Sequence, residues 1–89
     1  MKTAETELIN KLGLHARAAA KLVSTASGFS SKVRIGHGNQ MVDAKSIMSV
    51  MMLAASKGTK MKLEAEGEDA NAAINAILDL IGRRFEEDE

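Results

Sequence analysis

The 89-residue sequence contains no cysteine, no proline, no tryptophan and no tyrosine, and its only aromatic residues are Phe29 and Phe85. The absence of cysteine excludes disulfide bonds, cysteine metal sites and thiol catalysis. His15 and His37 are the only histidines, which is too few for a convincing zinc site. The absence of proline leaves the turns to Gly, Asn, Asp and Ser. We therefore expect a core of Ile, Leu, Val, Met and Ala, in a protein that uses no metal and no cofactor.

The sequence also has no excess of positive or negative charge, because twelve basic residues balance twelve acidic ones. A neutral chain argues against a nucleic-acid-binding protein held by general electrostatic attraction. No apolar run approaches membrane-spanning length, and the N-terminus leads into no apolar stretch of signal-peptide length. These features predict one small domain over residues 1–89 that is cytoplasmic and does not insert into membranes.

The spacing of apolar residues predicts four strands and three helices. Residues 60–66 alternate strictly between apolar and charged side chains, which is typical of a strand with one buried face. Residues 70–85 carry an apolar stripe at helical spacing, and Asp69 is a candidate N-cap. Gly28 suits a left-handed helix cap, and residues 86–89 form an acidic end that we expect to be frayed. The other strands are expected over residues 4–10, 31–35 and 40–43, and the other helices over residues 16–26 and 46–54.

These elements follow one another in the order β-α-β-β-α-β-α. The turn cluster Gly36–Asn39 indicates a hairpin between the second and third strands. A right-handed crossover is expected between the first strand and the second. We therefore predict an α+β fold, a two-layer open-faced sandwich. Its four-stranded antiparallel sheet would be covered on one face by all three helices, and its other face would be solvated.

The segment Gly13-Leu14-His15-Ala16-Arg17 lies between the first strand and the first helix. It places an imidazole at a helix N-terminus, where the backbone N–H groups of Ala16 and Arg17 lack intrahelical partners and the macrodipole is positive. Such a place binds phosphate. A neutral imidazole with a free lone pair is also a nucleophile. We therefore interpret His15 as a carrier of a phosphoryl group rather than an ordinary surface histidine. The positive charge of Arg17 is unfavourable at the positive end of the helix dipole. A bound anion beside Arg17 would compensate for this cost.

The helix after Lys45 is too short to bury all of its large apolar residues. Val50, Leu53 and Ala54 are expected to form its buried stripe. The others would then point outward, and they are Ile47, Met48, Met51 and Met52. Methionines pack at helix edges, but they are also common on surfaces that adapt to different partners. We interpret this set as a docking surface for other proteins.

Three segments, Gly13–Arg17, Lys45–Met48 and Ala65–Gly67, together resemble the HPr family of histidine-containing phosphocarrier proteins. These proteins belong to the phosphoenolpyruvate-dependent phosphotransferase system, and the resemblance extends over nearly the whole chain. It implies a carrier and not an enzyme. By this resemblance, His15 takes a phosphoryl group on Nδ1 from enzyme I and passes it to IIA-type proteins. Arg17 matches the arginine that neutralises the phosphate.

The resemblance also implies a regulatory role for Ser46, which matches a position phosphorylated in part of the family by a dedicated HPr serine kinase/phosphorylase. The same serine is a good helix N-cap, and the two roles are compatible. The family usually has proline at the position of Ala18 and often glycine at that of Ser49, but neither difference removes a chemical group. We expect a monomer whose partners are other proteins.

Three other functions share part of this pattern. A paralogue of the nitrogen branch, with a mainly regulatory role, would carry the same motifs. A hydrolase of the acylphosphatase type would need a second polar catalytic group near Arg17, which the sequence does not offer. A nucleic-acid-binding sheet of the RRM type would need aromatic residues on its exposed strands, and the predicted strands have none.

Overall fold

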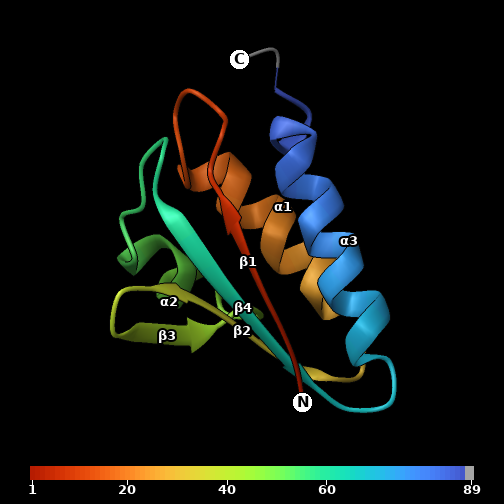
Figure 1. Cartoon of the computed structure of the whole chain (residues 1–89). Helices are drawn as coiled ribbons and strands as arrows, with labels where there is room; N and C mark the ends of the chain where they lie inside the picture. Colours follow the sequence, from red (N-terminus) through yellow and green to blue (C-terminus); the bar gives the residue numbers. More distant parts are fainter. Residues whose placement is uncertain (88–89) are drawn as a thin grey trace.

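The computed structural model describes residues 1–87 and contains one antiparallel sheet with the strand order β1-β4-β2-β3. Helices α1 and α3 lie side by side on one face of this sheet, and α2 lies beside β3 (Figure 1). The predicted open-faced α+β sandwich is therefore confirmed. The elements are β1 (Lys2–Glu7), α1 (Ala16–Ser27), β2 (Lys32–His37), β3 (Gln40–Asp43), α2 (Ile47–Met52), β4 (Lys60–Glu66), α3 (Ala70–Gly82) and the 3-10 helix η1 (Arg84–Glu86).

The core between the sheet and the helices is aliphatic, as the shortage of aromatic residues predicts. Strand β4 lies in the middle of the sheet and buries the apolar half of its alternating pattern. Leu22 of α1 and Ile77 of α3 are fully buried, and each side chain of this kind contributes about 1.5–3 kcal/mol on burial. The small side chains of Ala18 and Ala19 are also fully buried, so α1 can pack closely against its neighbours.

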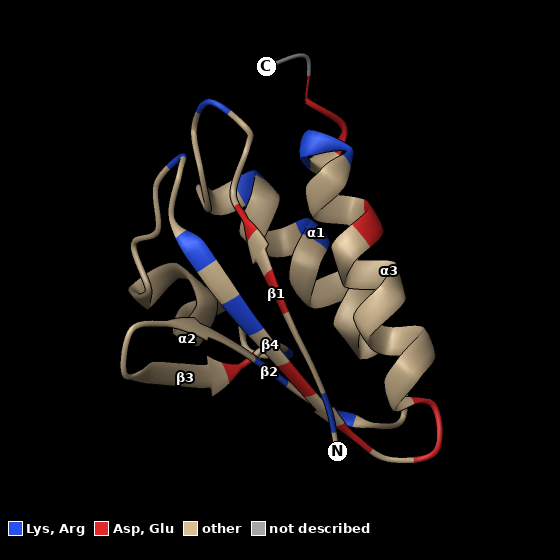
Figure 2. Cartoon of the chain, in the orientation of Figure 1, with Lys and Arg blue, Asp and Glu red and all other residues tan. Residues whose placement is uncertain are grey.

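The open face of the sheet carries opposite charges on neighbouring strands. Figure 2 shows the basic part of β4 beside the acidic part of β1. Such cross-strand pairs contribute roughly 0.2–1 kcal/mol each, and a slip of one residue would turn the apolar side chains of β4 into solvent. Charge and burial therefore select the same register. The facing pairs are Glu5–Lys62, Glu7–Lys60, Lys32–Glu66 and Arg34–Glu64.

The first strand differs from the prediction at both ends. It spans Lys2–Glu7 and not residues 4–10. The ladder between β1 and β4 ends after Glu7, because only one of the two hydrogen bonds of Leu8 keeps the register of the strands. The N–H of Leu8 donates to the carbonyl of Thr59 over 3.0 Å, and its carbonyl accepts from Gly58 over 2.8 Å.

Two of the predicted helix caps are also different in the structure. Gly28 ends α1 with a φ of −74°, so it is not a left-handed cap. Asp69 occupies the N-cap position of α3, but its side chain does not cap the helix. It accepts hydrogen bonds from the backbone N–H groups of Ser30 and Ser31, each over 2.9 Å, and also from both hydroxyls. The carboxylate of Asp69 thereby joins the start of α3 to the segment before β2.

The second helix begins as predicted and ends early. Ser46 is its N-cap, and the hydroxyl accepts a hydrogen bond from the N–H of Ser49 over 3.3 Å. Val50 and Leu53 are buried, as predicted, whereas Ala54 is exposed. The helix stops at Met52, and Ala54 has a φ of +50°, which turns its side chain away from the core.

The last helix ends at Gly82 and is followed by a left-handed turn. Arg84, Phe85 and Glu86 have φ values of 55°, 54° and 64°. Of the end that is expected to be frayed, Glu86 lies in η1 and the Glu87 side chain is hydrogen-bonded, and the fraying itself stays a prediction. Asp88 and Glu89 lie outside the described residues. No helix within residues 1–87 has the length and apolar character needed to cross a bilayer.

Candidate functional site

The loop before α1 is fixed in position by the loop that leads into β4. The N–H of Leu14 donates to the carbonyl of Ala55 over 2.9 Å. Gly13 has a φ of +63°, and a Cβ atom there would lie 2.5 Å from the same carbonyl oxygen. Glycine is therefore needed for both its backbone conformation and the close approach of the two loops. The buried Leu14 side chain holds the end of this loop in the core, so that the next residue begins the helix at a defined place.

His15 is the N-cap residue of α1, as predicted. Its backbone is extended, with φ −78° and ψ 178°, and its carbonyl accepts the hydrogen bond from Ala19 over 2.8 Å. The N–H groups of Ala16, Arg17 and Ala18 precede this bond and have no acceptor within the helix. The His15 side chain is 27% exposed, and no acidic residue lies in the first turn. A partly exposed imidazole therefore lies at a positive helix end.

The predicted phosphate-binding arginine is also available. Arg17 is exposed on the first turn of α1, and it forms no ion pair with another side chain of residues 1–87. A guanidinium offers five N–H donors in a planar fork that suits phosphate oxygens. Ala18, the position at which the resembled family usually has proline, is fully buried. Alanine has a backbone N–H that proline lacks, so Ala18 provides a third N–H group at this helix end.

The carboxylate of Glu87, which was not predicted as a site residue from the sequence, contacts the Nε2 atom of His15. Its other oxygen accepts a hydrogen bond from the side-chain amide of Asn10 over 3.0 Å. The same amide nitrogen donates to the carbonyl of Gly13 over 2.8 Å, and Asn10 is completely buried. Burial acts to raise the pKa of Glu87, but the hydrogen bonds from Asn10 and His15 outweigh it and lower the pKa below its ordinary value. Glu87 is therefore ionised at neutral pH.

The left-handed turn holds this carboxylate in place. Phe85 is fully buried, and its carbonyl accepts a hydrogen bond from the Lys21 ammonium of α1 over 2.7 Å. This bond joins α1 to a residue that follows 64 positions later in the sequence, and no local pattern in the sequence encodes such a contact. The one available signal was Phe85 itself, because an aromatic side chain four residues after Ile81 continues the buried stripe of α3.

The predicted docking surface is exposed. Helix α2 bears no charged residue (Figure 2), and its outward residues Ile47, Met48, Met51 and Met52 are 41%, 71%, 43% and 74% exposed. Leu12, which was not among the residues predicted for this surface, is 65% exposed in the loop before His15. His37 is half-buried, and its Nε2 donates to the carbonyl of Leu53 over 3.0 Å, so this histidine has a structural role. This bond anchors the end of α2.

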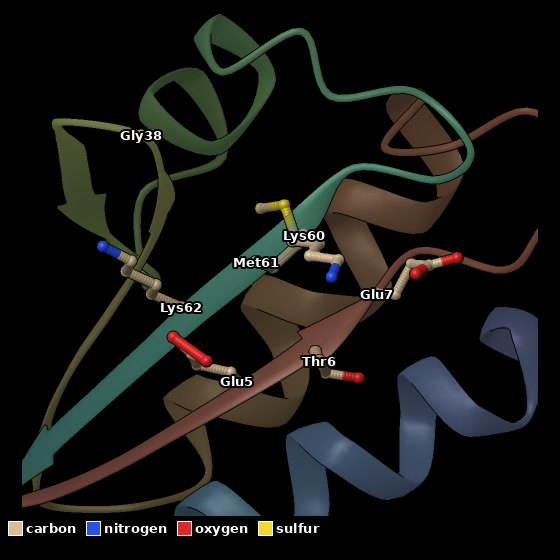
Figure 3. Close-up of a pocket in the computed structure, with 7 residues that line it drawn as sticks. All are labelled: Glu5, Thr6, Glu7, Gly38, Lys60, Met61 and Lys62. Atoms are coloured by element: carbon tan, nitrogen blue, oxygen red, sulfur yellow. The ribbon is translucent and has the colours of Figure 1, made fainter.

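A hollow of about 500 Å³ lies elsewhere, on the sheet beside β1 and β4 (Figure 3). Its rim is formed by the facing pairs Glu5–Lys62 and Glu7–Lys60, so it is a solvated groove between charged side chains. Its lining contains no histidine. Within residues 1–87, no group of three or more His, Asp or Glu side chains is arranged to hold a metal ion.

Comparison with known proteins agrees with this geometry. Residues 2–83 match the family model for the PTS HPr component phosphorylation site. The phosphocarrier protein HPr of Pseudomonas aeruginosa is 53% identical over 90 aligned residues, which cover 100% of both chains. The crystal structure of HPr-C-His from Thermoanaerobacter tengcongensis has a TM-score of 0.96 and 49% identity over 100% of both chains. The crystal structure of an HPr dimer from the same organism has a TM-score of 0.79 and 50% identity over 98% of this chain and 100% of that one. The chain therefore belongs to the PTS HPr family of phosphocarrier proteins.

Proposed function

We propose that this chain accepts a phosphoryl group on His15 from phosphorylated enzyme I and passes it to IIA-type proteins, acting as a cytoplasmic monomer. The observation that carries the proposal is the position of the His15 ring at the open N-terminus of α1, whose first turn also bears Arg17, a side chain without an ion pair within residues 1–87. Family membership supports the carrier role. The donor, the acceptor and the phosphorylated atom are part of the proposal.

The helix end and the guanidinium supply two kinds of support for the transferred group. Backbone N–H groups of Ala16 and Arg17 would donate to the phosphoryl oxygens, and the Arg17 side chain would add charge-assisted hydrogen bonds. The helix terminus alone contributes roughly 0.3–1 kcal/mol at an exposed site. This modest stabilisation suits a carrier, because a phosphate that was bound much more tightly could not be passed on.

We propose that both partners dock on the apolar surface of α2. An exposed and uncharged patch of this kind is typical of an interaction site. Methionine side chains adapt to differently shaped surfaces, as a carrier with several partners requires. Exposed Met48 and Met52 would contribute most of the contact area.

Ser46 is the proposed regulatory site. Its hydroxyl caps α2 and lies next in sequence to the docking surface. A phosphate on this hydroxyl would place a dianion beside apolar side chains that must lose water when a partner binds. We therefore expect Ser46→Asp to raise the KM for phosphorylated enzyme I while leaving kcat nearly unchanged.

The proposed function is tested by incubating the protein with radiolabelled phosphoenolpyruvate and enzyme I, and then with a IIA protein. The expected label on His15 is lost in acid, stable in base and transferred to the IIA protein. His15→Ala should take up no label, and His37→Ala is the matched control that should be labelled normally. Label that persisted in His15→Ala would overturn the proposal. Hydrolysis of an acyl phosphate by the isolated protein would instead favour a hydrolase.

A further inference from the structure

We infer that Glu87 is a positioning residue for the transfer proposed above, because its carboxylate binds the Nε2 side of the His15 ring and leaves Nδ1 free to attack phosphorus. The inference rests on the proposed function and extends it to a residue outside the phosphate-binding helix end. It assigns a chemical role to the C-terminal segment, which the sequence indicated only as an acidic end.

The carboxylate is held on both of its oxygens. One contacts His15 Nε2, and the other accepts from the buried amide of Asn10 over 3.0 Å. The Glu87 side chain is 15% exposed, less than the 27% of the ring that it contacts. Asn10 is itself fixed by its bond to the Gly13 carbonyl, in the loop that positions His15. The ring, the amide and the carboxylate therefore form one connected unit.

This contact selects one tautomer of the ring. A neutral imidazole has one N–H donor and one nitrogen lone pair, whereas an ionised carboxylate can only accept. The proton must therefore reside on Nε2 when the carboxylate of Glu87 binds there. The lone pair is then on Nδ1, which has no hydrogen-bond partner within residues 1–87. A carboxylate that orients a histidine and fixes its tautomer is a recurrent device in catalysis.

The same contact assists the transfer in both directions. In the forward step, the Nδ1 lone pair forms a bond to phosphorus, and the bond between phosphorus and the donor group of phosphorylated enzyme I breaks with its electron pair returning to that group. His15 retains its Nε2 proton, so the ring becomes positively charged, and the Glu87 carboxylate balances this charge. In the onward step, a nucleophile of the acceptor protein forms a bond to phosphorus as the Nδ1–phosphorus bond breaks. The electron pair of the broken bond returns to the ring, which leaves as a neutral imidazole. No proton needs to move in either step.

The contacts that anchor the turn over residues 84–87 are separate from the positioning role of Glu87. The buried Phe85 side chain and the hydrogen bond from Lys21 to the Phe85 carbonyl hold the turn. The Lys21 ammonium also attracts the Glu87 carboxylate, but the hydrogen bond that anchors the turn is not made to that residue. Glu87→Gln therefore removes the charge and the obligatory acceptor without removing the anchor. Glu86→Gln is the matched control, because it removes the adjacent charge, and its exposed ion pairs contribute little.

The experiment has two readouts on the wild type, Glu87→Gln, Glu87→Asp and Glu86→Gln. The first is the ¹⁵N NMR spectrum of the His15 ring at neutral pH, which reports the tautomer without any partner protein. The second is the rate of phosphorylation by enzyme I and phosphoenolpyruvate. We expect the wild type to have its proton on Nε2, and Glu87→Gln to give a mixture of tautomers with about tenfold lower kcat and little change in KM. Glu87→Asp should recover part of the wild-type tautomer preference and part of the wild-type kcat. Glu86→Gln should match the wild type in both readouts.

Each outcome decides between the two proposals. If Glu87→Gln keeps the wild-type tautomer or the wild-type kcat while the wild type is phosphorylated, the positioning role is wrong and the carrier function stands. If the change is in KM alone, Glu87 belongs to the docking surface and the inference is also overturned. If the wild type takes no phosphate from enzyme I, the proposed function itself fails.

Discussion

Replacing Phe85 by alanine should cost about 1 kcal/mol of stability, far less than the removal of a buried phenylalanine normally does. A Phe→Ala change in a core costs about 3–5 kcal/mol. Phe85 is fully buried, but it lies within three consecutive left-handed residues, and each of them raises the energy of the folded chain by roughly 1–2 kcal/mol. Without the aromatic anchor, the turn is free to relax and this strain of about 3–6 kcal/mol is recovered.

The relaxation has its own cost, because the bond from Lys21 to the Phe85 carbonyl is lost. Hydrogen bonds to charged groups contribute about 1.5–3 kcal/mol, and partial exposure of the Lys21 side chain favours the lower value. The lost packing of the aromatic ring and the lost hydrogen bond together exceed the recovered backbone strain, and the net destabilisation is about 1 kcal/mol. For a domain of this size, that corresponds to a decrease in Tm of about 4–8 °C.

The assay is thermal unfolding followed by circular dichroism, with Ile81→Ala as the matched control. Ile81 is equally buried, but it lies in the regular part of α3, where no strained backbone can relax. Its replacement should cost about 2–5 kcal/mol. Hydrogen exchange should show that Phe85→Ala releases the amides of residues 84–87 and leaves α3 protected. If both variants lost the same stability, the left-handed turn would not be strained and the reasoning would be refuted.

Three further predictions concern other parts of the molecule. Hydrogen bonds from Ser31 and Ser30 lower the pKa of Asp69 from 3.8 to about 2, so the stability that the carboxylate contributes is present above pH 3.8 and is lost as the pH falls toward 2. Urea unfolding between pH 2 and pH 6 should show a weaker acid dependence in Asp69→Asn, and an unchanged dependence would contradict this. Gly13→Ala should lower the free energy of unfolding by more than Gly38→Ala, since both glycines have positive φ but only Gly13 lies against another loop. Equal losses in urea titrations of the two variants would exclude a steric role for the loop contact. Met48→Ser should change stability by less than about 0.5 kcal/mol but raise the KM for enzyme I, and a loss of thermal stability would show that Met48 packs in the core.

The fold was largely predictable because its central elements have unambiguous patterns. The strict alternation of residues 60–66 corresponds to β4 at both ends, and the apolar stripe that follows corresponds to α3. The edge strand β1 was placed wrongly because one half-buried strand at an edge has a weak apolar pattern. Its end is decided by the hydrogen bonds of Leu8 to a loop fifty residues later, which the local sequence does not encode.

The candidate site was predictable only on its helical side. The glycine, the histidine and the arginine lie within five residues, so local rules for a helix N-terminus were sufficient to bring them together. Glu87 could not be found in this way, because its contact with His15 depends on a left-handed turn made by ordinary L-residues. An acidic composition favours a solvated end. The buried Phe85 overrides that tendency.

The surface of α2 has a consequence for kinetics, because donor and acceptor would both have to bind there. Apart from Met1, the large apolar side chains exposed within residues 1–87 belong to this helix and to Leu12, and the open side of the sheet is lined with charge pairs. Two partners that need one patch and one histidine cannot be bound at the same moment. Steady-state transfer should therefore follow a ping-pong pattern, with parallel double-reciprocal lines, and excess unphosphorylated acceptor should slow the loading of the carrier.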